Sequence, residues 1–231
     1  MQPAAVNPAA GFFIMKKRTL KELESICGTL SKPSKMPCFS FNTSTSGCIT
    51  GSKLVDIEGT TCSGCYAMKG NYTRYPAGEL ARLKRLAAVR RNLPAWQEAI
   101  TELIGRKEKS SHFRWHDSGD IQSVEHLAAI NDIALALPQI RFWLPTRESG
   151  FISAFILKNG SFAPNLTVRL SALKLKGVAP NALAKRLGIP TSTVGWQGTK
   201  HTCPSNKQGN KCGDCRACWQ PAVQNVDYPF H

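Results

Sequence analysis

Apolar residues recur at helical spacing in six stretches of the chain. After Ser123, apolar positions at steps of three and four continue to Leu137, and Pro138 lies just beyond. Because serine is a preferred N-cap residue and proline does not continue a helix, this stretch predicts a helix with one buried face. The same reasoning predicts helices over residues 20–27, 78–92, 94–105, 151–158 and 181–187.

Short apolar runs between these helices predict strands over residues 112–116, 140–144, 166–170 and 191–196. Strands that alternate with helices are typical of parallel βα units. We therefore expect an α/β fold whose parallel βα units form a partial barrel or an open sheet. The expected organisation is an irregular N-terminal extension (1–45), an α/β core that begins with a Cys loop (46–199), and a C-terminal Cys-rich metal-binding segment packed on the core (200–231).

Composition adds a strong positive charge. The 231 residues include 30 Lys and Arg against 15 Asp and Glu, a formal net charge of +15. Such an imbalance favours a polyanionic partner, here DNA, RNA or a nucleotide, although a basic surface without a specific partner remains an alternative. No apolar run approaches the roughly 20 residues of a membrane span, and no secretion signal begins the chain. We therefore expect a cytoplasmic protein that does not contact a membrane.

Nine cysteines make metal binding the leading chemical hypothesis. An odd number without a secretion signal argues against a disulfide framework. Cys212, Cys215 and Cys218 follow one another at the two-residue intervals of ferredoxin ligands, and Cys203 precedes them, followed by a proline. Four thiolates suit a [4Fe–4S] cluster, and they also suit one tetrahedral zinc ion.

A second cysteine set lies near the N-terminus. Cys62 and Cys65 are separated by two residues, and Cys48 lies upstream of them. Three thiolate ligands leave one position of a cluster open to a substrate or cofactor. Two alternatives remain: Cys62 and Cys65 join two C-terminal cysteines in a zinc-ribbon-like site, or Cys48 is only a buried thiol. Cys27 and Cys38 are expected to bind no metal.

Polar residues follow the predicted strand 112–116. His116, Asp117, Ser118 and Asp120 would emerge at the carboxyl edge of the sheet, where α/β proteins bind ligands. Gly119 would let the backbone approach a ligand closely. The alternative for this polarity is capping of the next helix by Asp120 and Ser123.

The next two strands repeat the arrangement. Arg147 and Glu148 follow one strand, and Arg147 could hold a carboxylate or phosphate; the alternative is a surface ion pair between the two. Arg169 lies within an apolar strand and needs an acidic partner, for which Asp117 or Glu148 would serve. We therefore expect one shared pocket at this edge.

Several motifs resemble the phage gene-product-88 family. They are CSGCYA at 62–67 with KGNY at 69–72, FRWHDSGD at 113–120, FWLPTRE at 142–148, NLTVR at 165–169 and CGDCRACW at 212–219. The resemblance covers most of residues 35–231. It implies a phage or prophage origin, hence the cytoplasm of a host cell, and it implies little about chemistry.

A looser resemblance is to radical S-adenosylmethionine enzymes, which use a partial βα barrel and a three-cysteine [4Fe–4S] cluster. The resemblance implies that Cys48, Cys62 and Cys65 hold that cluster and that the four C-terminal cysteines hold an auxiliary one. It also implies that the turn Ser118-Gly119-Asp120 binds the amino group of S-adenosylmethionine. The spacing departs from the family, because thirteen residues instead of three separate the first two cysteines.

The resulting hypothesis is a phage-encoded iron–sulfur protein that performs radical or redox chemistry on a nucleic acid or nucleotide. Its pocket would be lined by Asp117, Ser118, Asp120, Arg147, Glu148 and Arg169. The alternative is a non-enzymatic nucleic-acid-binding protein in which a cluster or a zinc ion has only a structural role. The sequence leaves the oligomeric state open.

Overall fold

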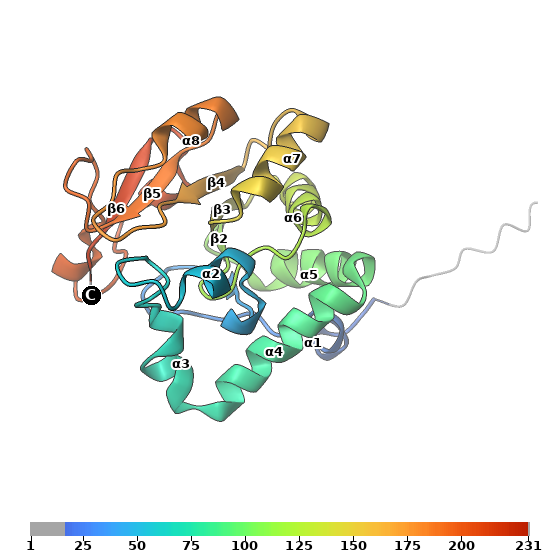
Figure 1. The fold of residues 1–231 in the computed structure, drawn as a ribbon. Helices are drawn as coiled ribbons and strands as arrows, with labels where there is room; N and C mark the ends of the chain where they lie inside the picture. Colours follow the sequence, from blue (N-terminus) through green and yellow to red (C-terminus); the bar gives the residue numbers. More distant parts are fainter. Residues whose placement is uncertain (1–16, 231) are drawn as a thin grey trace, which may run out of the picture.

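The computed structural model describes residues 17–230. Six parallel strands form one sheet in the order β1-β2-β3-β4-β5-β6. The strands are β1 (Ser40–Phe41), β2 (His112–Trp115), β3 (Arg141–Thr146), β4 (Leu166–Ser171), β5 (Thr191–Val194) and β6 (Asn225–Tyr228). Successive strands are neighbours, so right-handed crossovers place the connecting helices on one face (Figure 1). The predicted α/β class with parallel units is confirmed, and the sheet is open.

Eight α-helices accompany these strands in the described part of the chain. They are α1 (Leu20–Cys27), α2 (Ile49–Leu54), α3 (Asn71–Arg74), α4 (Pro76–Arg91), α5 (Leu93–Lys107), α6 (Val124–Ala136), α7 (Ser149–Asn159) and α8 (Asn181–Leu187). Local signals set their ends, as predicted: the Ser123 side chain accepts a hydrogen bond from the His126 amide, and α8 ends at Gly188 in the left-handed conformation. The short helices α2 and α3 were not predicted. No helix in residues 17–230 is long and apolar enough to cross a membrane.

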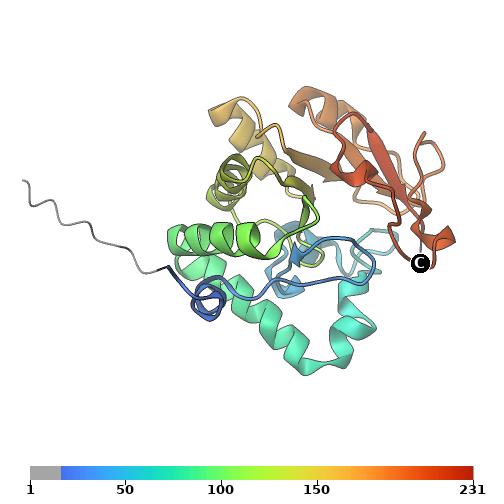
Figure 2. The same cartoon turned by 180° about the vertical axis from the view of Figure 1, so that it is seen from behind.

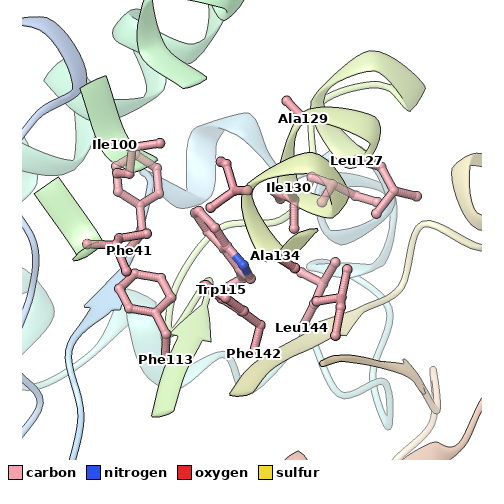
Figure 3. Packing of buried hydrophobic residues seen from close by; sticks show 14 of the residues in the cluster. Phe41, Ile100, Phe113, Trp115, Leu127, Ala129, Ile130, Ala134, Phe142 and Leu144 are labelled. Carbon is pink, nitrogen blue, oxygen red and sulfur yellow. The ribbon is translucent and has the colours of Figure 1, made fainter. Parts of the chain in front are cut away.

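The main core lies between the helices and the outer face of the sheet. Phe113 and Trp115 of β2 and Phe142 of β3 point toward α5 and α6 (Figure 3). Ile100 of α5 and Ile130 of α6 meet them from the other side, and all five side chains are fully buried. Successive side chains of a strand point to opposite faces of the sheet, so every second residue of β2 and β3 faces the helices.

The opposite face of the sheet is concave. Trp143 of β3 stacks on Tyr228 of β6, with ring centroids 6.3 Å apart. These strands are three positions apart in the sheet, and neighbouring strands lie roughly 4.8 Å apart, so a flat sheet would separate them by about 14 Å. The sheet therefore curls around a second cluster that contains Met36, Cys38, Trp143 and Trp219.

The two edge strands come from segments that the sequence analysis expected to be irregular. β1 lies within residues 1–45 and pairs with β2, while β6 lies within residues 200–231 and pairs with β5. A two-residue strand carries no detectable periodicity, and β6 is surrounded by loop residues. The segments that precede and follow the α/β core therefore supply the two edge strands of the sheet. Residues 1–16 of the expected extension lie outside the described residues.

Candidate functional site

The connection between β1 and β2 crosses the carboxyl edge of the sheet and carries three of the cysteines (Figures 1 and 2). Thr50 donates to Glu148 from its amide at 2.7 Å and from its hydroxyl at 2.8 Å. The Thr61 amide donates to the Leu173 carbonyl at 2.8 Å. These bonds fasten the connection to the loops that follow β3 and β4. They place its cysteines where the sequence analysis expected a pocket.

Within this connection Cys48 and Cys62 are close neighbours. A Cβ atom built on Gly51 would lie 3.7 Å from each of their sulfur atoms. Burial, together with the smaller effects of the adjacent Asp120, Cys65 and Cys62, raises the pKa of the Cys48 thiol to about 12. Cys48 and Cys65 occupy the N-cap positions of short helices, yet neither side chain makes a capping hydrogen bond. Cys65 lies near enough to raise the pKa of both Cys48 and Cys62, although among residues 17–230 the three side chains do not converge as a preformed metal site.

Arg147 provides positive charge beside these thiols. Its Nε donates to the Thr61 hydroxyl at 3.0 Å, and its charge lowers the pKa of Cys62 against the larger, opposing effect of burial. The Glu148 carboxylate accepts its hydrogen bonds from Thr50, not from Arg147. The alternative of an Arg147–Glu148 surface pair is therefore wrong, because each side chain is held by the Cys-bearing connection.

Asp120 joins the carboxyl ends of β2 and β3. It accepts hydrogen bonds from the Thr146 hydroxyl at 2.6 Å, the Arg147 amide at 3.0 Å and the Ile121 amide at 2.8 Å. Burial raises its pKa to about 6, although these three bonds favour the charged form. Capping of α6 is done by Ser123, so Asp120 has a different structural task.

Gly119 lies where two loops approach closely. Its φ of +79° is in the left-handed region, and an added Cβ would overlap the Thr43 hydroxyl. The neighbouring Ser118 hydroxyl donates to the Thr43 carbonyl at 2.9 Å. The residue is therefore required for packing of the β1 loop against the turn after β2.

We predict that Gly119→Ala lowers the free energy of unfolding by about 2 kcal/mol, because strain and overlap with Thr43 add. Gly160 is the matched control, since its φ is +82° and nothing lies within 4 Å of an added Cβ. Gly160→Ala should cost about 1 kcal/mol, from strain alone. Denaturant titration of both variants measures the difference; equal costs would mean that the contact with Thr43 has no energetic weight.

Asp117 is a structural anchor. Its carboxylate accepts from the Ser40 hydroxyl at 2.5 Å, the Asn42 amide group at 3.0 Å and the Tyr72 hydroxyl at 2.8 Å. The Tyr66 hydroxyl donates to its backbone carbonyl. Sequence reasoning missed both tyrosines, and only their position just after the Cys62–Cys65 pair could have suggested them.

Two of the four C-terminal cysteines, Cys212 and Cys218, lie on the concave side of the sheet, and Cys203 lies beside β6, where its amide donates to the Asp227 carbonyl at 2.7 Å. The sulfur of Cys218 is 3.3 Å from the Tyr228 hydroxyl, and the sulfur of Cys215 is 3.7 Å from Nε2 of His201. Cys212 and Cys218 pack against the second cluster, which includes Cys38. The sequence analysis had set Cys38 aside, and it offered no signal for His201.

These thiols share one environment. Burial raises the pKa of Cys218 to about 12, and burial together with the nearby Cys203 raises that of Cys212. Soft sulfur donors in such a group fit an iron–sulfur cluster or zinc. In residues 17–230, no three His, Cys, Asp or Glu side chains converge to the geometry of a preformed metal site.

Arg169 is fully buried and holds the C-terminal segment in place. Within residues 17–230 its guanidinium donates only to backbone carbonyls, at 2.7–3.1 Å; these belong to Thr191, Ala217, Cys218, Gln220 and Val223. The prediction of an acidic partner is therefore wrong. Five carbonyl dipoles disperse the charge instead, as they do for cations at helix C-termini.

The expected pocket residues thus occupy two places. Asp117, Ser118, Asp120, Arg147 and Glu148 lie at the carboxyl edge beside the N-terminal cysteines. Arg169 lies under the C-terminal cysteines. The pKa of Cys62 responds to the charges of Arg147, Cys65 and Asp120, so these groups lie near its thiol. This favours a site built from the N-terminal cysteines over the zinc-ribbon alternative, in which Cys62 and Cys65 would join two C-terminal cysteines.

A buried histidine pair was not anticipated. His116, just after β2, and His126 of α6 have ring centroids 5.5 Å apart beside Trp96 and Trp115. Both His116 ring nitrogens, Nε2 of His126 and both indole nitrogens are buried without hydrogen-bond partners among the described residues. Burial, with Arg114 nearby, lowers the pKa of His116 to about 3, and burial with His116 lowers that of His126 well below its usual value.

Comparisons with known proteins agree with the motif-based resemblance. A family model described as Gene product 88 matches residues 14–221. No curated protein and no solved structure matches the chain. The looser resemblance to radical S-adenosylmethionine enzymes therefore has no support from these comparisons. Because the match spans most of the sequence, the chain belongs to the Gene product 88 family.

Proposed function

We propose that this protein is an iron–sulfur protein whose C-terminal cysteines hold a [4Fe–4S] cluster. The proposal rests on the packing of Cys212 and Cys218 against the second cluster and on the proximity of Cys203 and Cys215, which raise the pKa of Cys212. Their sulfur atoms are the donors that such a cluster requires, and their spacing is that of ferredoxin ligands. The aromatic rings of Trp143 and Trp219 would shield the cluster from water, which tunes its potential.

We further propose that Cys48, Cys62 and Cys65 hold a second cluster with one open coordination position. Such a cluster supplies electrons to a ligand bound at that position. Arg147, beside these thiols, suits a carboxylate, and the buried Asp120 carboxylate suits an ammonium group. An amino-acid moiety such as that of S-adenosylmethionine carries both groups, so a radical enzyme is the activity that this arrangement supports best.

A second candidate function is a purely structural metal centre. Four of the five bonds from Arg169 bind residues 217–223 to β4, and the fifth reaches Thr191 of β5. A metal on the same segment would strengthen its attachment to the sheet. Zinc would serve that purpose as well as a cluster does.

The test is iron, zinc and acid-labile sulfide per chain in protein purified without oxygen. Two clusters predict about eight irons with matching sulfide. Cys65→Ala and Cys215→Ala should each remove about half of the iron, whereas Cys27→Ala should remove none, because Cys27 lies in the helical core and contacts Leu23. Zinc without sulfide would overturn the cluster proposal and favour the structural centre.

Binding of the proposed cofactor is measured separately, by calorimetric titration of S-adenosylmethionine into the iron-loaded protein. Arg147→Gln should weaken binding at least tenfold without changing the iron content, since Arg147 is a ligand-facing charge and holds no metal. An unchanged affinity in this variant would remove Arg147 from the site.

A further inference from the structure

Positive charge is concentrated in the segment that follows the Cys62–Cys65 pair. Residues 66–91 contain seven basic residues and one acidic residue, Glu79. This stretch covers α3 and α4, which form a V-shaped arm at one side of the molecule in both views (Figures 1 and 2). The arm therefore holds a large share of the net charge in a small part of the chain.

Part of this charge is used inside the protein. Arg82 is buried and pairs with Glu79 at 2.7 Å, and Glu79 also accepts from the Ser44 hydroxyl. Arg85 is buried and donates to the Thr29 carbonyl at 2.7 Å and to Asn42. The sole acidic residue of the arm is thus occupied, and these two arginines serve the fold.

The five remaining cations are exposed. Arg90 is engaged by the Gln122 side chain, to which it donates at 2.7 and 3.0 Å. Lys69, Arg74, Lys84 and Arg91 form no ion pair within residues 17–230. Surface cations on a stable protein are more often interspersed with acidic groups. An arm with free cations and no free carboxylate fits a polyanion.

Two exposed tyrosines lie among these cations. Tyr75, between α3 and α4, is 58% exposed, and Tyr66 is 56% exposed. The Tyr66 ring is fixed in place, because its hydroxyl donates to the Asp117 carbonyl and its edge meets Tyr72 with ring centroids 5.6 Å apart. Exposed flat rings between cations are the features on which unpaired bases stack. We name the set Tyr66, Lys69, Arg74, Tyr75, Lys84 and Arg91 the α3–α4 strip.

We propose that the α3–α4 strip binds single-stranded nucleic acid. Lys69, Arg74, Lys84 and Arg91 contact its phosphates, and Tyr75 stacks on a base. The 16 residues of α4 extend about 24 Å, enough for roughly four nucleotides. The strip begins at Tyr66, next to Cys65, so a bound strand passes beside the N-terminal cysteines. The proposal is independent of any metal, because none of these six side chains is a candidate ligand.

Fluorescence anisotropy with a labelled single-stranded 12-mer, as DNA and as RNA, tests the charges of the strip. The quadruple variant Lys69→Gln, Arg74→Gln, Lys84→Gln and Arg91→Gln should reduce the slope of log affinity against log salt by roughly 2 to 3. The matched control removes four exposed cations elsewhere: Arg141→Gln, Lys158→Gln, Lys185→Gln and Arg186→Gln. The control should retain the slope, and equal losses in both variants would overturn the strip as the site. Circular dichroism melts verify that both variants fold.

Stacking is tested by Tyr75→Ala. It should weaken binding roughly tenfold and leave the salt slope unchanged, because no charge is removed. Leu157→Ala is its control, since Leu157 is 90% exposed on α7. Tighter binding of the duplex form, or of vesicles rich in anionic lipid, than of the single strand would overturn the proposal. The titration is repeated with Cys65→Ala protein, which should lack the proposed N-terminal cluster. Nucleic-acid binding should persist in this variant, so the two proposals can fail independently.

Discussion

Arg169→Gln should lower the free energy of unfolding by about 4 kcal/mol, the largest effect that we expect from a single substitution. The guanidinium serves five carbonyl groups with its donors, and glutamine has only two N–H donors on a shorter side chain. Most of these carbonyls would then be buried without a partner. Denaturant titration measures the loss, and limited proteolysis within residues 200–224 shows whether the C-terminal segment detaches first.

Two further variants make the Arg169 prediction specific. Arg169→Lys keeps the charge but has three donors, so it should retain an intermediate stability. Arg141→Gln removes an exposed arginine of the same sheet and should cost less than about 0.5 kcal/mol. If Arg169→Gln costs no more than Arg141→Gln, the carbonyl contacts do not hold the segment.

Acidification from pH 7 to pH 5 should destabilise the protein by about 3 kcal/mol. His116 and His126 are neutral when folded, because burial lowers the pKa of His116 to about 3 and lowers that of His126 well below its usual value. The unfolded chain binds their protons below about pH 6.5, so His116, with its folded pKa of about 3, destabilises the fold by about 2 kcal/mol at pH 5, and His126 adds a loss in the same direction. The free energy of unfolding is therefore unaffected by these histidines above about pH 6.5, and it decreases as the pH falls below that value.

Asp120 acts in the opposite direction in the same window. Burial raises its folded pKa to about 6, so the folded state holds a proton that the unfolded chain releases above about pH 4. Protonation of Asp120 in the folded state therefore increases the free energy of unfolding by about 1 kcal/mol between pH 7 and pH 5. The net acid loss of about 3 kcal/mol includes this term.

Denaturant titrations at pH 7, 6 and 5 measure this dependence, and two variants should shift it in opposite directions. His116→Gln removes one titrating histidine and should reduce the acid loss by about 2 kcal/mol. Asp120→Asn removes the opposing group and should increase the loss by about 1 kcal/mol. A free energy of unfolding that stays level or rises toward pH 5 in the unmodified protein would contradict the neutral histidine pair.

The main elements of the fold could be predicted because their signals are local. The Ser123 cap, the Gly188 terminus and the apolar runs of β2 to β5 each act within a few residues. Alternation of helix and strand then favours parallel pairing, since antiparallel strands need no helical crossover. The edge strands β1 and β6 escaped prediction because pairing with β2 and β5, not their own residues, makes them strands.

The partners of the site residues could not be predicted in the same way. Arg169 in an apolar strand implied a carboxylate partner, but the fold brings carbonyls from residues 191–223 to it. Glu148 was considered as a partner of Arg169 or, alternatively, of its neighbour Arg147, and it binds Thr50, 98 residues away. Such contacts depend on how loops distant in sequence lie against the sheet.

By itself, the sequence determined the α/β class, most helices and strands, the separation of the cysteines into two sets, and the polar ends of β2 and β3. Each follows from local spacing or composition. Only the tertiary structure decided that the β1–β2 connection covers the carboxyl edge, that Arg169 anchors the C-terminal segment, and that His116 meets His126. The reason is physical: hydrogen-bond donors and titratable groups acquire partners and pKa values from long-range packing, which no local pattern encodes.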